Sequence, residues 1–166
     1  MKKTVIVVSA LAMLMLVIVV APAVSAKTLK CEQTIYFNDY GVPGPHPDHL
    51  GETAYWKGTT TGALTGTSYY WETAKNYVVG KVEHFFEDFY IDLGDGWVSG
   101  YDNGVWNFAT FKFRSTGRIT DASANYAYMI GCKFHEEGIT TDPGPDFTEL
   151  PIIGTGTCFI GPQPIQ

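Results

Sequence analysis

The chain has 166 residues, a formal net charge of −6 and a charged fraction of 17%. An acidic surface repels the phosphate backbone, so we expect no nucleic-acid partner. Aromatic residues make up 14% of the chain, which also contains 18 glycines. There is no extended stretch rich in Ala, Leu, Glu and Lys, so the composition favours strands and turns over helices.

The first 26 residues predict an export signal. Lys2 and Lys3 give a positive start, an apolar run covers 5–20, and small residues lead to Ala26. This is the pattern of a cleaved secretory signal. We expect cleavage near Ala26 and a secreted or extracytoplasmic domain over 27–166, with a charge of −8 and no stable membrane insertion. An uncleaved anchor is the alternative, because 5–24 is nearly long enough to span a bilayer.

Taken in chain order, eight segments have the pattern of strands separated by turn signals. The sequence therefore predicts an all-β fold, a single eight-stranded antiparallel up-and-down barrel. We expect Asp102-Asn103-Gly104 to form a hairpin turn, since Asn and Gly accept a positive φ. Long loops are expected over 41–50 and 140–151. The expected strands lie near 28–38, 52–58, 63–73, 77–93, 96–101, 104–114, 125–135 and 152–160.

Strand parity places all three cysteines, Cys31, Cys132 and Cys158, on inward faces. In an up-and-down barrel the last strand pairs with the first and the penultimate strands, which would place Cys158 between Cys31 and Cys132. An oxidising compartment favours a disulfide, and three pairings are open. We prefer Cys31 with Cys158, because this bond would join the two strands at the seam. The remaining thiol is expected to be buried and inert.

The segment 77–93 changes its apolar face partway along, which predicts a β-bulge near Phe85 and Phe86. With this extra residue, His84 and Glu87 would both face the interior. A buried His and Glu in contact form a candidate catalytic acid/base pair. The alternative is a pair at a solvated rim with a structural role.

Aromatic side chains suggest a ligand pocket. Trp56, Trp71, Trp106, Tyr126 and Tyr128 are the candidate binding residues, because aromatic rings give a small apolar ligand a large contact area. Packing in the core is the alternative role for them. The sequence has no established metal or nucleophile motif, so we expect no cofactor and no metal site.

Three consecutive motifs carry a family resemblance: Gly104-Val-Trp-Asn-Phe-Ala109, the stretch 111–123, and Tyr126-Ala-Tyr-Met-Ile-Gly131. Together they resemble the small eight-stranded barrels of the allene oxide cyclase and dirigent type. The resemblance implies a closed barrel with an apolar lumen. The Gly-Gly-x-Gly-x-Phe stretch of those families is absent, so no catalytic residue is carried over from them.

Three functions remain open, because one barrel fold hosts many functions. The favoured one is a secreted barrel that binds a small apolar ligand in its lumen. The second is an allene oxide cyclase-like isomerase or cyclase that works without a cofactor and uses His84 and Glu87. The third is an envelope or surface protein with an interaction role alone. A homo-oligomer is possible in each case.

Overall fold

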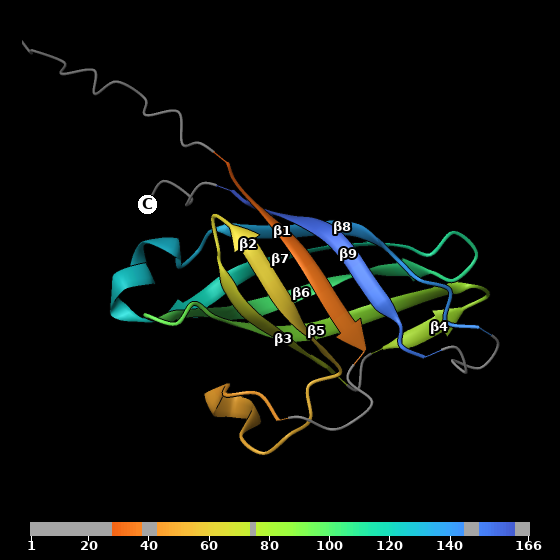
Figure 1. Ribbon diagram of the computed structural model, residues 1–166, viewed down its shortest axis with the longest axis horizontal. Coiled ribbons are helices and arrows are strands. Elements are labelled where there is room, and N and C mark those ends of the chain that lie inside the picture. The colour runs from red at the N-terminus through yellow and green to blue at the C-terminus, as the bar shows by residue number, and fades with distance from the viewer. Residues whose placement is uncertain (1–27, 38–42, 74–75, 145–149, 162–166) are drawn as a thin grey trace, which may run out of the picture.

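The computed structural model describes residues 28–37, 43–73, 76–144 and 150–161, so the predicted export signal lies outside the described residues (Figure 1). None of the described helices is long and apolar enough to cross a membrane. The elements are β1 (Leu29–Phe37), η1 (Pro47–His49), β2 (Trp56–Gly62), β3 (Gly66–Glu72), β4 (Tyr77–Val79), β5 (Val82–Asp92), β6 (Trp97–Asn107), β7 (Lys112–Ala122), η2 (Ala124–Met129), β8 (Lys133–Thr140) and β9 (Ile153–Ile160), where η denotes a 3₁₀ helix.

The strands form one antiparallel sheet that closes on itself. Its order is β3-β2-β1-β9-β8-β7-β6-β5-β4, and a further pairing joins β3 to β5. The short strand β4 pairs with the first residues of β5 and lies beside the closed barrel. The predicted eight-stranded antiparallel barrel is therefore confirmed. The segment expected as one strand over 77–93 is divided into β4 and β5 by a turn at Gly80 and Lys81.

Alternation along the strands separates the lumen from the outer surface, because successive side chains of a strand point to opposite faces. In β1, for example, Cys31, Gln33 and Ile35 are buried and alternate with exposed Lys30 and Glu32. The inward positions therefore determine what the barrel contains, and their chemistry differs between its two ends.

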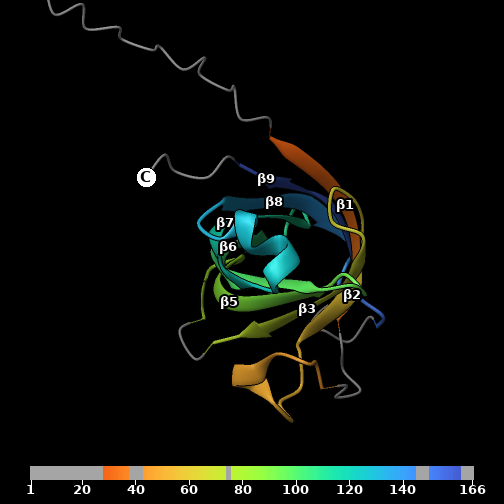
Figure 2. The same ribbon diagram turned by 90° about the vertical axis from the view of Figure 1, so that its left-hand side faces the viewer.

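One end of the barrel is filled and capped. The helix η2 crosses this end (Figure 2) and contacts β6 and β7. Burying a large apolar side chain stabilises a fold by about 1.5–3 kcal/mol, so the buried side chains of this half stabilise the barrel. Its side chains, each at most 1% exposed, are Leu64, Ile91, Val98, Ile119, Met129, Phe134 and Ile160.

A disulfide joins Cys31 in β1 to Cys158 in β9, as preferred from the sequence. The two residues lie directly opposite each other in the sheet, 127 residues apart along the chain. The predicted position of Cys158 between two other cysteines is wrong, because its neighbour in β8 is Glu136. Cys132 precedes β8 and is a buried free thiol. The disulfide is consistent with an oxidising, extracytoplasmic environment.

The hairpin turn predicted at Asp102-Asn103-Gly104 is wrong, since all three residues lie inside β6. Gly104 is needed there for close packing, because a β-carbon at this position would collide with the Arg114 carbonyl oxygen of β7 and with the ring of Phe85. The chain turns instead after Asn107, whose side-chain oxygen accepts hydrogen bonds from the next turn.

The strand predicted over 125–135 is also wrong. Its first part is η2, and β8 begins at Lys133. Two tertiary hydrogen bonds hold this helix at the barrel end: Trp97 N donates to Ser123 Oγ over 2.9 Å, and Asn125 donates to the Asp95 carbonyl oxygen over 2.9 Å. Because these partners belong to the loop before β6 and its first residue, the local alternation of aromatic residues could not reveal the helix.

The β-bulge predicted near Phe85 and Phe86 is absent from the described pairings of β5. Its register with β6 is continuous from Val82 to Asp92. Plain alternation therefore holds, with Phe85, Glu87 and Phe89 on the buried side. A register shift does occur elsewhere, between Ser99 and Gly100 in β6 where it faces β7.

Candidate functional site: an acidic and aromatic lumen

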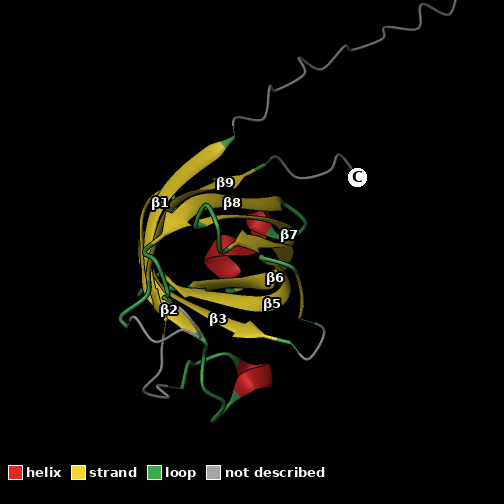
Figure 3. Cartoon of the chain, turned by 90° about the vertical axis from the view of Figure 1, so that its right-hand side faces the viewer, coloured by secondary structure: helices red, strands yellow, loops and turns green. Residues whose placement is uncertain are grey.

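The end of the barrel opposite η2 holds a narrow cavity with an enclosed space of about 30 Å³. Figure 3 shows the barrel from this end. The cavity is lined by Ile35, Trp56, Glu72, Glu83, Phe85, Glu87, Trp106, Phe113, Glu136 and Thr140. These residues come from seven strands, so only the closed barrel brings them together.

Aromatic rings form the walls of the cavity. The rings of Trp56 and Trp106 meet edge to face with their centroids 5.6 Å apart, and the Trp106 indole donates a hydrogen bond to Thr140 Oγ1 over 3.0 Å. Phe113 packs against the backbone of β8, where a side chain at Gly138 would collide with its ring. These contacts hold the aromatic walls close together, and the space between them is narrow.

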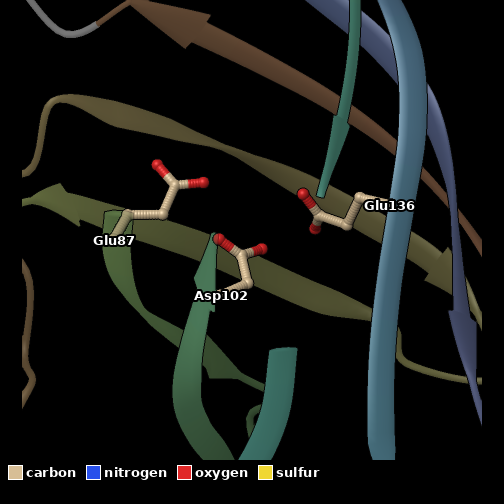
Figure 4. A group of neighbouring side chains, drawn as sticks. All are labelled: Glu87, Asp102 and Glu136. Atoms are coloured by element: carbon tan, nitrogen blue, oxygen red, sulfur yellow. The ribbon is translucent and has the colours of Figure 1, made fainter. Parts of the chain in front are cut away.

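Three buried carboxyl groups meet at the deep end of the cavity, where Glu87 and Glu136 line it and Asp102 lies beside them. Glu87 from β5, Asp102 from β6 and Glu136 from β8 point toward one another inside the barrel (Figure 4). Their side chains are 7%, 1% and 2% exposed, respectively. One oxygen from each lies within 4.8 Å of the others, so the group has the oxygen chemistry and spacing to hold a cation. We call these three residues the acidic floor.

Hydroxyl groups connect the acidic floor to the barrel wall. The buried Tyr70 hydroxyl lies 2.9 Å from Gln33 Oε1 and 2.7 Å from Glu136 Oε1, and it donates to one of them at a time. The Ser115 hydroxyl donates to Asp102 Oδ2 over 2.7 Å. These contacts fix the orientation of two of the three carboxyl groups.

Burial shifts the protonation of the floor, because a desolvated carboxylate is unfavourable. Burial, together with the negative charge of Asp102, raises the pKa of Glu136 to about 8. Burial raises the pKa of Asp102 to about 6 although the hydrogen bond from Ser115 opposes the shift. Burial, and then the charges of Asp102 and Glu136, raise the pKa of Glu87 well above its ordinary value. The floor therefore retains protons near neutral pH.

Two more carboxyl groups line the cavity outside the floor. Burial, and then repulsion by Glu83, raise the pKa of Glu72 to about 7, and burial also raises the pKa of Glu83. Among the described residues that line the cavity, none is basic. The open half of the lumen is thus acidic throughout its depth.

The structure separates the predicted acid/base pair. Glu87 faces the lumen, but His84 lies on the other face of β5 and stacks on Tyr77 of β4, with ring centroids 4.7 Å apart. The inward placement of His84 was wrong because it depended on the bulge. Glu87 instead has Asp102 and Glu136 as its neighbours.

The predicted aromatic pocket is divided in the same way. Trp56 and Trp106 line the cavity. Tyr126 and Tyr128 lie in η2 at the capped end, and Tyr128 is 60% exposed. Trp71 lies outside the lumen, where its ring stacks on His49 from the segment 43–55. Only the first two tryptophans are therefore brought to the site.

The sequence analysis missed Asp102 and Glu136, which complete the acidic floor. Asp102 was assigned to a turn, although it shares parity with Val98 and Trp106 of the same strand. Glu136 lies just beyond the predicted strand end at 135 and shares parity with the buried Phe134. The sequence did contain a signal for both residues: each is a carboxyl residue at an inward position of an otherwise apolar strand face.

Comparisons of the chain with protein-family models, with curated proteins and with solved structures found no match. The functional argument therefore depends on the geometry of the lumen.

Proposed function

We propose that the protein is a small-ligand-binding barrel that takes a compact ligand with an apolar body into the open half of its lumen. The observation that carries the proposal is the contrast between the two ends of the barrel. One end is filled by side chains and covered by η2, whereas the other holds an aromatic-walled cavity. A barrel that needed stability alone would gain from filling both ends.

The cavity has the features of a binding site. Its enclosed space of about 30 Å³ is below the roughly 300–1,000 Å³ of most ligand pockets, so a ligand enters only as the aromatic walls move apart. Trp56 and Trp106 offer ring faces and edges to an apolar group, while Glu87 and Glu136 supply polar contacts at its deep end. Aromatic walls with few, fixed polar groups are typical of sites that orient a small molecule.

The isomerase or cyclase alternative has less support. Its acid/base pair required His84 inside the lumen, and that side chain stacks on Tyr77 outside it. An enzyme in this lumen would have to work with Glu87 and the other carboxyl groups of the floor. A role as an envelope or surface protein requires no cavity, so it does not explain why one end of the barrel is left unfilled.

We also propose that the protein is exported and that residues 1–26 act as its cleaved signal. The Cys31–Cys158 disulfide supports an extracytoplasmic location, because such bonds persist in oxidising compartments. We further propose that the chain is related to the barrels of the allene oxide cyclase and dirigent type. The closed antiparallel sheet and the motifs over 104–131 support this relationship. Mass spectrometry of the protein from its own host tests the cleavage, with a mature start at Lys27 as the expected result.

NMR of the tryptophan indole groups tests ligand entry. The chain has four tryptophans, of which Trp56 and Trp106 line the cavity whereas Trp71 and Trp97 belong to a separate outer cluster. Titration with 2-phenylethanol and phenethylamine should shift the first two indole N–H signals and leave the other two in place. The variants W71F and W97F assign the outer signals. No change at Trp56 and Trp106, or changes confined to the outer pair, would exclude the lumen as the binding site.

A further inference from the structure

We propose that the outer face of strands β7 and β8 binds an acidic polysaccharide, a chain of sugars that carries carboxylate or sulfate groups along its length. Its contacts are four basic side chains, which we call the basic stripe: Lys112, Arg114 and Arg118 of β7 and Lys133 of β8. This face is the outside of the barrel wall, so the inference goes beyond the proposed lumenal binding and does not depend on it.

The basic stripe gathers positive charge on one face of an acidic protein. The chain has a net charge of −6, and its two arginines both belong to the stripe. Lys112, Arg114 and Arg118 occupy even-numbered positions of β7, whose odd-numbered residues Phe113 and Ser115 are buried. Alternation therefore directs the three basic side chains to the outer surface, along about 20 Å of the strand.

The arrangement of these charges is unfavourable without an anionic partner. Arg118 lies directly opposite Lys133 in the antiparallel pairing of β7 with β8, and like charges in this position destabilise a sheet. Among the described residues, no carboxylate makes an ion pair with any member of the stripe, although Asp121 and Glu137 lie on the same two strands. An anionic ligand would supply the missing opposite charge.

The flanking strands add no charge to this face. The residues that pair with the outward positions of β7 and β8 are uncharged: Tyr101, Val105 and Asn107 of β6, and Thr157 and Phe159 of β9. The negative charge of the protein is therefore kept away from the stripe on both sides. An anionic chain that crosses the face meets basic side chains bordered by neutral ones.

A shallow hollow in the same face offers contacts for one acidic sugar. The ionisable side chains that line it are all basic, namely His84, Arg114 and His135. The planar guanidinium of arginine can bind two oxygens of a carboxylate or sulfate group together. Asn103 and Thr116 line the hollow as well, and their amide and hydroxyl groups can exchange hydrogen bonds with sugar hydroxyls.

The spacing of the charges favours a polysaccharide over a nucleic acid. Side chains two residues apart on a strand are separated by roughly 7 Å, whereas duplex DNA has one negative charge per about 1.7 Å of its axis. The stripe would neutralise few of these phosphates, and the acidic remainder of the protein would repel the others. A polysaccharide with one acidic group on each sugar carries its charges farther apart. The ring of Tyr101, which is 46% exposed and lies opposite Arg118, adds a flat surface for a sugar ring.

Isothermal titration calorimetry of the full protein with polygalacturonate and with chondroitin sulfate tests the inference. Methyl-esterified polygalacturonate is the uncharged control. We expect both acidic chains to bind and the ester not to bind, with an affinity that falls as salt rises because binding releases counterions. Arg118→Gln combined with Lys133→Gln should weaken binding at least about tenfold and reduce its salt dependence. Lys30→Gln combined with Lys57→Gln removes the same charge from β1 and β2, and this matched control should bind as the wild type does.

A second double variant separates binding from packing. Arg118 also donates a hydrogen bond to the Gly131 carbonyl oxygen over 2.8 Å, so its replacement affects the wall of the barrel as well. Lys112 and Arg114 are exposed, and Lys112→Gln combined with Arg114→Gln should weaken binding in the same direction. Binding of neither acidic chain, or unchanged binding in both stripe variants, would overturn the inference. Tighter binding of a DNA duplex or of phosphatidylglycerol vesicles at the same salt would overturn it in favour of a nucleic acid or a membrane.

Discussion

The protonation of Glu136 predicts a specific pH dependence of stability. Its pKa is raised from 4.5 to about 8, so the folded state binds a proton that the unfolded chain has released. A group with a raised pKa contributes full stability below its unfolded pKa, and this contribution is lost as the pH rises toward its folded pKa. At about 1.4 kcal/mol per pKa unit, the free energy of unfolding should fall by about 3 kcal/mol between pH 5 and pH 8 through this group alone.

Urea denaturation of the ligand-free protein, followed by tryptophan fluorescence, measures this effect. Glu136→Gln keeps the shape of the side chain and cannot ionise, so its free energy of unfolding should fall by about 3 kcal/mol less over the same pH range. The other buried carboxyl groups titrate in both proteins, so the difference between the two proteins measures Glu136 together with its interaction with Glu87 and Asp102. Glu137→Gln should follow the wild type, because Glu137 is exposed. Equal pH dependence in Glu136→Gln and the wild type would refute the buried, protonated floor.

Three further results are expected. Replacing both Cys31 and Cys158 by Ser should lower the free energy of unfolding by about 4 kcal/mol, because the disulfide closes a long loop. Urea denaturation under identical conditions measures this effect, and an unchanged free energy of unfolding would contradict the stabilising role of the disulfide. Gly104→Val should lower the melting temperature by at least several degrees, because the new side chain would collide with the Arg114 carbonyl oxygen and with Phe85. An unchanged transition in scanning calorimetry would contradict that packing. His49 has a raised pKa, since hydrogen bonds to Glu52 and Asp88 outweigh its burial; Asp88→Asn should lower this pKa, measured from the His49 ring signals by NMR.

The fold class was predictable from the sequence because alternation and turn spacing are local signals. The first and last strands, expected over 28–38 and 152–160, lie within one residue of β1 and β9. The Cys31–Cys158 disulfide followed from parity together with the closure of the barrel. The alternation and the cysteine parity behind these predictions can each be read within a single segment of the chain.

The middle of the chain was harder to predict, because residues typical of turns are present there for contacts with other strands. Asn103-Gly104 has the composition of a hairpin turn, yet Gly104 lies inside β6, where the Arg114 backbone and Phe85 of the two neighbouring strands leave no room for a side chain. Placing the turn there removed Asp102 from the lumen and shifted the following strand. Similarly, η2 depends on hydrogen bonds to Asp95 and Trp97, which are distant in sequence.

The candidate site was recognised in part. Glu87, Trp56 and Trp106 were identified, since charged and aromatic residues within apolar strands are visible in the sequence. The grouping of Glu87 with Asp102 and Glu136 depends on the order β8-β7-β6-β5 around the barrel and on how far each strand is staggered. Parity alone cannot give that stagger, so it could not show that three carboxyl groups meet at one depth.

A crystal structure of the protein grown with 2-phenylethanol tests the proposed lumenal binding most directly. The account predicts the ligand in the open half of the lumen, in contact with Trp56 and Trp106. A complex in which the ligand occupies the outer surface, while the lumen holds no ligand, would contradict it.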